Sequence, residues 1–145
     1  MFETQNNNRE VKKLLSQYKR TKELIRDLER QSEDMGEQAT CIKSTSNISG
    51  MPRGGVPYTV ADLLADKDEI DRRIKKLETV AAQRKEIVQT YIDTVLSVRH
   101  NRFLTLYYIR CMTIDQISDQ EGYVDRSGYR IFSEALDMVD TSINL

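Results

Sequence analysis

The sequence contains few of the residues on which catalytic and metal sites depend. Its 145 residues include no Trp, two Pro, two Cys and one His. Cys41 and Cys111 form no Cys-x-x-Cys pair, and His100 has no cysteine or acidic partner nearby in sequence, so we predict no metal site and interpret His100 as a surface or helix-end histidine. Gly54 and Gly55 are not followed by Lys and Ser or Thr, which excludes a phosphate-binding loop. We therefore expect neither an enzyme nor a cofactor.

Long apolar runs are also missing. No stretch approaches the ~20 apolar residues that a membrane-spanning helix requires. The chain starts MFETQNNNRE, which is polar from the third residue and has no signal-peptide pattern. We expect a cytoplasmic protein with no membrane partner, and for that reason no disulfide between its two cysteines.

Charged residues are abundant instead, at 31% of the chain against an average near 25%. Residues 1–35 include a predicted amphipathic helix from Arg9 to about Met35, because apolar side chains recur there at steps of three and four. Thr21 and Ser32 occupy two of those steps. Residues 9–30 carry eight basic and four acidic side chains, a net charge of +4.

Residues 36–59 are predicted to be a linker. Four of the six glycines and both prolines lie there, and turn-forming residues at this density end a helix. Two interpretations stay open, because the segment from Met51 to Gly55 is either part of a flexible loop or docks elsewhere.

A second long helix is predicted over residues 60–99, starting at Thr59 or Asp62. Apolar residues recur along it at the same steps of three and four, and two positions of this repeat are polar, Lys67 and Arg84. Eight acidic and eight basic residues alternate along it, which is typical of a helix that exposes its outer side.

The apolar positions of each long helix form a seam along one side of it. These two seams must be covered by each other in an antiparallel hairpin, by a second chain, or by both. We favour a homodimer, since a dimer can read two half-sites. The seam residues predicted to carry the pairing are Val11, Leu14, Ile25, Leu28, Ile70, Ile74, Leu77 and Val88.

Residues 100–145 are predicted to form three short helices, which makes the whole chain all-α. The first runs from Asn101 to Cys111. Thr113 and Gln116 fit a capping box at the start of the second, and Gly122 suits a left-handed break after it. Asp125 is predicted to cap the third. Helix, glycine-containing turn and helix form the helix-turn-helix pattern, with a core of Phe103, Leu106, Tyr107, Ile117, Ile131, Phe132 and Leu136.

The C-terminal pattern reads LYYIRCMTIDQISDQEGY, then YRIFSEAL, and it follows a linker containing SGMPRGG. It resembles the fourth region of sigma factors. It is more similar to small phage regulators of the ArpU and RinA type, and most similar to a related phage family with a long helical N-terminal half. The resemblance covers about residues 48–136. It implies a phage-encoded transcriptional regulator in a bacterial host, acting on promoter DNA of late genes together with RNA polymerase.

Two positions depart from that family pattern. Val124 stands where Ser or Thr usually caps the third helix, and Gly128 replaces an apolar residue. Because glycine costs a helix interior about 1 kcal/mol relative to alanine, we expect the third helix to start a residue late or to pack loosely.

The resemblance also implies which residues contact double-stranded DNA. Bases would be read by Arg126, Ser127, Tyr129 and Arg130, and phosphates held by Arg102 and Arg110. However, residues 100–145 carry four basic and seven acidic side chains. The alternative is therefore a protein-interaction module or anti-activator that docks on RNA polymerase or another regulator, and a plain three-helix core with solvated arginines also stays open.

Overall fold

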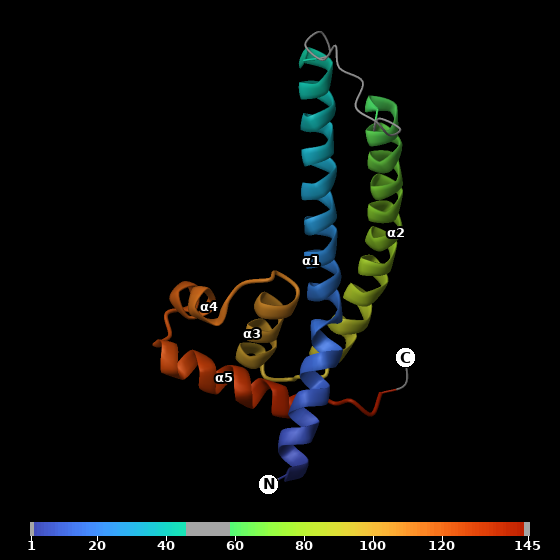
Figure 1. Cartoon of the computed structure of the whole chain (residues 1–145). Helices are drawn as coiled ribbons and strands as arrows, with labels where there is room; N and C mark the ends of the chain where they lie inside the picture. The colour runs from blue at the N-terminus through green and yellow to red at the C-terminus, as the bar shows by residue number, and fades with distance from the viewer. Residues whose placement is uncertain (1, 46–58, 144–145) are drawn as a thin grey trace. The chain divides into compact units, whose positions relative to one another are not determined.

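A computed structural model describes residues 2–45 and 59–143. These ranges contain five helices and no strand (Figure 1), which confirms the predicted all-α class. The helices are α1 (Phe2–Thr45), α2 (Val60–Asp93), α3 (Val98–Tyr108), α4 (Ile114–Glu121) and α5 (Asp125–Met138).

The two long helices pack against each other and run in opposite directions. The chain divides into two compact units, and each contains part of both helices. The first unit comprises residues 1–22 and 80–145, and the second comprises residues 23–79.

In the second unit, apolar side chains of α1 and α2 meet along the predicted seams. Ile25, Leu28 and Ala39 from α1 are buried, as are Leu63 and Ile74 from α2. Burying each of the leucine and isoleucine side chains contributes about 1.5–3 kcal/mol. The seam residues therefore cover one another within a single chain.

Polar residues join the two helices at one point of this seam. The Ser32 hydroxyl donates to Asp71 at 2.6 Å, and Lys67 Nζ donates to the other carboxylate oxygen at 3.0 Å. The Ser32 hydrogen bond, followed by the Lys67 bond, lowers the pKa of Asp71. Because buried polar groups need partners, these bonds favour one register of the two helices.

The first unit contains a matching polar pair. The Arg84 guanidinium donates to the Thr21 hydroxyl at 2.6 Å, and Thr21 is only 2% exposed. Around this pair, apolar residues of both helices are buried, namely Val11, Leu15, Tyr18, Ala81, Val88 and Ile92. Thr21 and Arg84, which are polar residues within the apolar repeats of the two helices, thus bond to each other.

The seam residues predicted to carry dimerisation are covered within one chain. Five of them are buried and three are half-buried; the buried ones are Val11, Ile25, Leu28, Ile74 and Val88, and the half-buried ones are Leu14, Ile70 and Leu77. The hairpin alternative accounts for this burial without a second copy. A homodimer stays a prediction.

The predicted boundary at residue 35 is wrong, because α1 continues through Gly36 to Thr45. A single glycine costs a helix only about 1 kcal/mol, and the buried Ala39 lies beyond it. The remaining linker residues, 46–58, include the segment from Met51 to Gly55 and lie outside the described residues. The start of α2 agrees with prediction, since Thr59 and Asp62 bond reciprocally in a capping arrangement.

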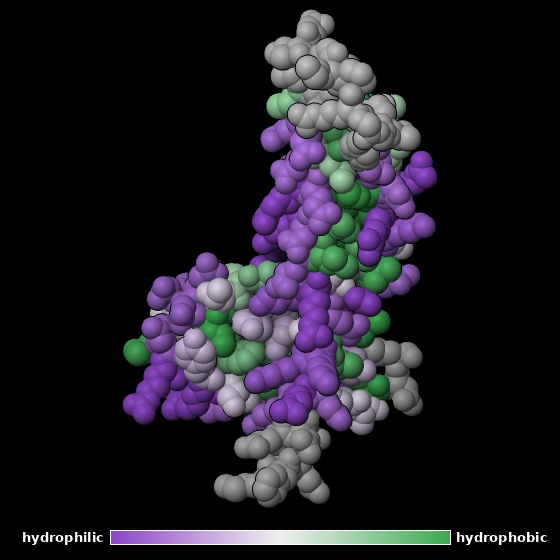
Figure 2. Space-filling view, in the orientation of Figure 1, coloured by the Kyte–Doolittle hydropathy of each residue, from purple (hydrophilic) through white to green (hydrophobic). Residues whose placement is uncertain are grey.

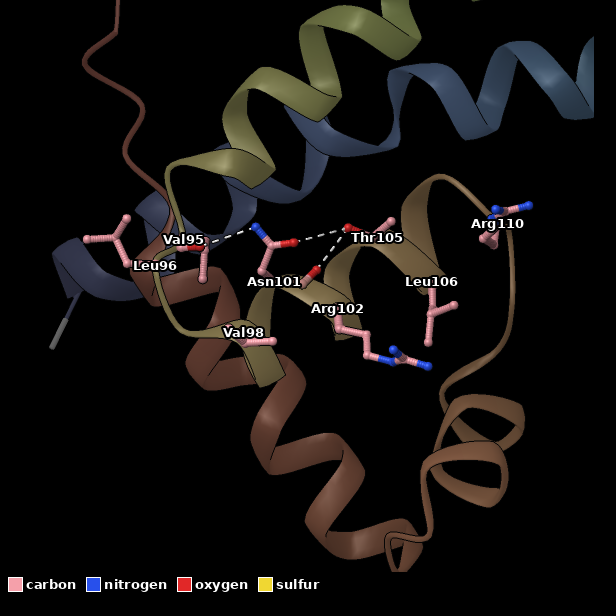
Figure 3. Close-up of a pocket in the computed structure, with 8 residues that line it drawn as sticks. All are labelled: Val95, Leu96, Val98, Asn101, Arg102, Thr105, Leu106 and Arg110. Carbon is pink, nitrogen blue, oxygen red and sulfur yellow. Dashed lines mark hydrogen bonds between the residues drawn. The ribbon is translucent and has the colours of Figure 1, made fainter.

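The predicted end of the second helix is also wrong, because α2 stops at Asp93 and α3 begins at Val98. Figure 3 shows part of the cause. The Asn101 side chain donates to the carbonyl oxygens of Ile92 and Val95 at 3.1 and 3.2 Å, and Figure 3 draws the bond to Val95. These bonds join the last turn of α2 and the connection after it to α3, and the Ile92 carbonyl also accepts from the Val95 amide.

Helices α3, α4 and α5 pack on one another around an aromatic core. Five of the seven predicted core residues are buried, and these are Phe103, Ile117, Ile131, Phe132 and Leu136. Leu106 and Tyr107 are only half-buried, while Leu104 and Tyr108 are buried instead. Burial raises the pKa of the Tyr108 phenol.

Candidate nucleic-acid interface

The turn between α4 and α5 has the geometry predicted from the sequence. Thr113 caps α4, because its hydroxyl accepts from the Gln116 backbone amide while the Gln116 side chain accepts from the Thr113 amide. At the other end, Gly122 adopts a left-handed conformation with φ of 78°, which glycine does at little steric cost. A capped helix, a left-handed glycine and a following helix position α5 against α4.

The start of α5 differs from the prediction. Val124 occupies the N-cap position, and its side chain makes no cap hydrogen bond. Asp125 is the first helical residue, where a carboxylate is still favoured by the helix dipole. The predicted Asp125 cap is therefore wrong by one residue, and the helix does not start late.

Gly128 marks a close approach of α5 to α4. It is buried, and a Cβ atom there would overlap the Ser118 hydroxyl oxygen and lie 3.3 Å from the Ser118 Cβ. The Ser118 hydroxyl in turn donates to the Ile114 carbonyl at 2.8 Å. Glycine therefore permits tight packing here, which contradicts the loose helix predicted from helix propensity alone.

The residues predicted to read bases lie along α5 with different exposures. Arg126, Tyr129 and Arg130 are exposed, and Ser127 is half-buried. Arg126 forms no ion pair in the described part of the chain, whereas Arg130 Nε lies 3.8 Å from a Glu134 carboxylate oxygen. At that distance, with 70% of the Arg130 side chain exposed, the pair is weak and leaves the guanidinium available.

The two arginines predicted to hold phosphates also differ in whether they form an ion pair. Arg102 Nε donates to Glu121 at 2.7 Å, which ties α3 to the end of α4. Arg110 is exposed and forms no ion pair among the described residues. Neither contributes to the groove that Tyr129 of α5 lines.

That groove lies between the N-terminal part of α1 and helices α3 to α5, and its volume is about 730 Å³. One wall is basic and contains Arg9, Lys12, Lys13, Lys19 and Arg20; the other is largely aromatic and contains Tyr107, Tyr108, Ile114, Tyr129 and Phe132. Lys19 Nζ lies 4.0 Å from the centroid of the Tyr107 ring, a cation–π contact between the two walls. Figure 2 shows the hydrophilic surface of this part of α1.

This arrangement changes the charge balance around α5. Residues 100–145 alone carry four basic and seven acidic side chains, but residues 1–22 add six basic and two acidic ones, and residues 80–99 add three and two. The unit formed by these three segments is therefore net +2. The basic part of α1 that lies near α5 is distant from it in sequence. For this reason the sequence did not indicate that the two helices share a groove.

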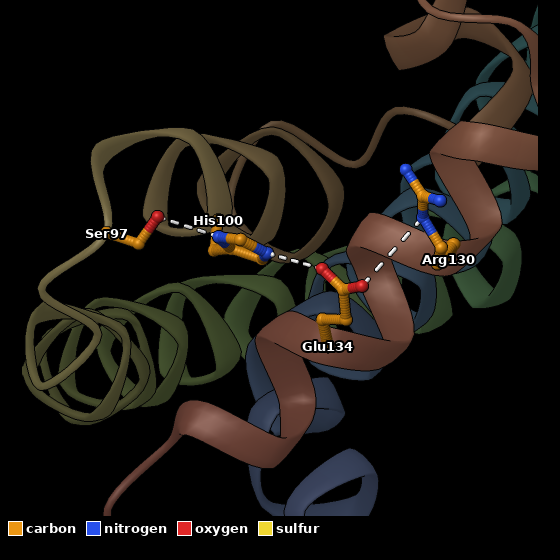
Figure 4. A network of polar contacts seen from close by, with 4 residues as sticks. All are labelled: Ser97, His100, Arg130 and Glu134. Atoms are coloured by element: carbon orange, nitrogen blue, oxygen red, sulfur yellow. Dashed lines mark hydrogen bonds and ion pairs between the residues drawn. The ribbon is translucent and has the colours of Figure 1, made fainter.

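His100 connects α3 to α5 (Figure 4). It is 5% exposed, its Nδ1 lies 2.7 Å from the Ser97 hydroxyl, and its Nε2 lies 3.0 Å from a Glu134 carboxylate oxygen. His100 lies in the first turn of α3, as a helix-end histidine, but it is not a surface residue. Its acidic partner comes from α5, which inspection of neighbouring sequence positions missed.

The hydrogen bond from His100 lowers the pKa of Glu134 and outweighs the opposing effect of burial, and the positive charge of Arg130 lowers it further. Glu134 therefore bonds to His100 and lies near Arg130 at once. Through it, the α3–α5 contact is connected to one of the arginines predicted to face DNA.

In residues 8–41 and 59–143 no group of His, Cys, Asp and Glu side chains has an arrangement that could hold a metal ion. Among the same described residues, no helix is both long enough and apolar enough to cross a membrane. Comparison with known proteins returns no matching family model, no matching curated sequence and no matching solved structure.

Proposed function

We propose that this chain is a phage-encoded transcriptional regulator that binds promoter DNA with two elements of one unit. In this proposal α5 enters the major groove, and the basic wall of α1 contacts the flanking phosphates. The observation that carries the proposal is the basic–aromatic groove, because Tyr129 of α5 lines it together with five basic residues of α1.

The geometry of α4 and α5 supports base reading by α5. In helix-turn-helix proteins the second helix of the motif lies in the major groove and contacts base edges near its N-terminus. Arg126 and Arg130 are one turn apart in the first half of α5 and both are exposed. Arginine contacts guanine through two parallel hydrogen bonds, so these residues are suited to sequence discrimination.

The charge of α1 supports phosphate binding. DNA affinity depends largely on cations that neutralise phosphates and release counterions. The basic residues of the groove recur along α1 from Arg9 to Arg20, a length of about 16 Å at 1.5 Å per residue. A row of this length can lie along several phosphates of one duplex strand, which follow one another about every 3.4 Å along the duplex axis.

The test is binding of the 145-residue chain to the DNA upstream of its own gene and to a scrambled duplex of equal length. We expect the double variant Arg126→Ala/Arg130→Ala to lose the preference for the upstream duplex, by about 1–3 kcal/mol for each base contact removed. It should keep its weak binding to the scrambled duplex. Fluorescence anisotropy measures both affinities, and circular dichroism checks that helicity is unchanged.

A protein-docking function is the second candidate, and two contacts favour it. Arg102 is bonded to Glu121, and Arg130 lies near Glu134, so two of the predicted DNA-binding arginines have acidic neighbours. In this alternative the chain acts on RNA polymerase or another regulator without binding DNA. A folded protein that binds neither duplex at low salt would favour docking over the DNA proposal.

A further inference from the structure

The two most exposed large apolar side chains in the described part of the chain are two residues apart at the α2–α3 connection. Leu96 is 92% exposed and Val98 is 81% exposed. They border an open groove of about 490 Å³, whose other lining residues include Val95, Leu106, Arg102 and Arg110. Scattered apolar residues at a surface are ordinary, but a contiguous apolar patch marks an interaction surface.

The backbone that presents this patch is well bonded. The Val95 amide donates to the Ile92 carbonyl at 2.9 Å, and Asn101 donates to the carbonyls of both residues. Thr105, one turn further along α3, bonds back to Asn101. Leu96 and Val98 are therefore exposed by a fixed connection and do not lie in a loosely held loop (Figure 3).

The groove is basic as well as apolar. Val98, Arg102 and Leu106 recur at steps of four and project from one side of α3, and Arg110 lies at its far end. Arg102 is neutralised by Glu121, but Arg110 forms no ion pair among the described residues. A segment that fits here should be apolar and carry acidic side chains.

The same unit carries such a segment at the end of α5. Met138 is exposed and lies between the exposed acidic residues Asp137 and Asp140. The Asp140 amide donates to the Thr94 hydroxyl at 3.0 Å, which holds this segment at the α2–α3 connection. Leu96 is two residues from Thr94 and Met138 is two residues from Asp140, so both are close in sequence to this hydrogen bond.

We propose that this surface, comprising the α3 groove with Leu96 and Val98 and the acidic end of α5, binds a second copy of the chain. A two-fold symmetric interface needs complementary features on the same copy, so that each contact occurs twice. Here each copy offers a basic apolar groove and an acidic apolar segment. The hairpin seams are covered within the chain and are not needed for this contact.

The test is the mass of the chain in solution without DNA, so its outcome is independent of the proposed function. Sedimentation equilibrium should give twice the chain mass of 16.8 kDa. Leu96→Asp/Val98→Asp should raise the dissociation constant of the dimer by more than about 100-fold. The matched control is Leu24→Asp/Leu64→Asp, since these leucines are 43% and 45% exposed in the other unit. It should leave the dimer intact.

A charge-reversal pair tests the partner segment. Arg110→Asp alone should weaken the dimer, and adding Asp137→Arg should restore it, because each reversed charge again meets its opposite in the other copy. All variants should keep the circular dichroism spectrum of the wild type. A wild-type chain that stays at 16.8 kDa at every concentration, or a dimer unaffected by Leu96→Asp/Val98→Asp, would overturn the proposal.

Discussion

At the scale of single residues, local preference and tertiary packing oppose each other at Gly128. Helix propensity favours alanine over glycine in a helix interior by about 1 kcal/mol. Packing favours glycine, because the Ser118 side chain fills the space that a Cβ atom would need. Ser118 is fully buried and hydrogen-bonded, so it has little room to move.

We therefore predict that Gly128→Ala destabilises the protein, by about 1–3 kcal/mol, as overpacking of a closed contact does. Urea denaturation followed by circular dichroism measures the change. The double variant Ser118→Ala/Gly128→Ala removes the overlapping hydroxyl and should be more stable than Gly128→Ala alone. A Gly128→Ala protein more stable than wild type would show that α4 and α5 do not approach closely.

At the scale of helices, each element is positioned by polar contacts that join it to another. Thr21 with Arg84 and Ser32 with Asp71 join α1 to α2, and Asn101 connects α3 to the end of α2. His100 and Glu134 join α3 to α5. Removing one member of such a pair leaves a buried group without its partner, which costs about 1–3 kcal/mol.

The Glu134 contact predicts a pH dependence. The folded protein holds the pKa of Glu134 below its ordinary value of 4.5. A carboxyl group with a depressed folded pKa stabilises the fold above its unfolded pKa, and that contribution is lost as the pH falls through the folded value. We predict that Glu134→Gln loses less stability than wild type between about pH 5 and pH 3.

Urea denaturation at a series of pH values tests this, with Glu78→Gln on the exposed side of α2 as the matched control. The control should follow the wild-type curve. Parallel curves for wild type and Glu134→Gln would contradict the contribution assigned to the His100–Glu134 contact.

Periodicity predicted much of the element scale, and contacts distant in sequence account for the errors. The 3-4 spacing located both long helices, and the Thr113–Gln116 and Gly122 patterns located α4 and its end. No glycine or proline lies at the end of α2, where the Asn101 side chain bonds to the Ile92 carbonyl, so composition could not reveal that break. Gly128 was misjudged because propensity contains no information about Ser118.

The candidate site was predicted only in part for the same reason. Arg126, Tyr129 and Arg130 are exposed on α5, as a reading helix requires. The basic wall of α1 lies at least 87 residues from Tyr107 in sequence, and nothing in either segment alone indicates that they share a groove. Only the folded unit brings these cations beside α5.

At the scale of the whole molecule, we propose that phosphate binding belongs to one part of one helix. Helices α1 and α2 carry basic residues in both units, but among the described residues only those of α1 from Arg9 to Arg20 line the groove beside α5. If DNA affinity depended on overall charge alone, cations of either unit would contribute equally. We propose instead that the position of a basic residue determines whether it contributes to DNA affinity.

The most direct test compares two variants that lose the same charge at different positions. Lys12→Ala/Lys13→Ala/Arg20→Ala removes three cations from the groove, and Arg72→Ala/Lys75→Ala/Lys76→Ala removes three exposed cations from α2 in the other unit. The measurement is the slope of the logarithm of DNA affinity against the logarithm of salt concentration, which counts phosphate contacts at about 0.9 per contact. We predict that the groove variant reduces the slope by up to about 2.7, while the α2 variant keeps the wild-type slope. Equal slopes for the two variants would contradict the account.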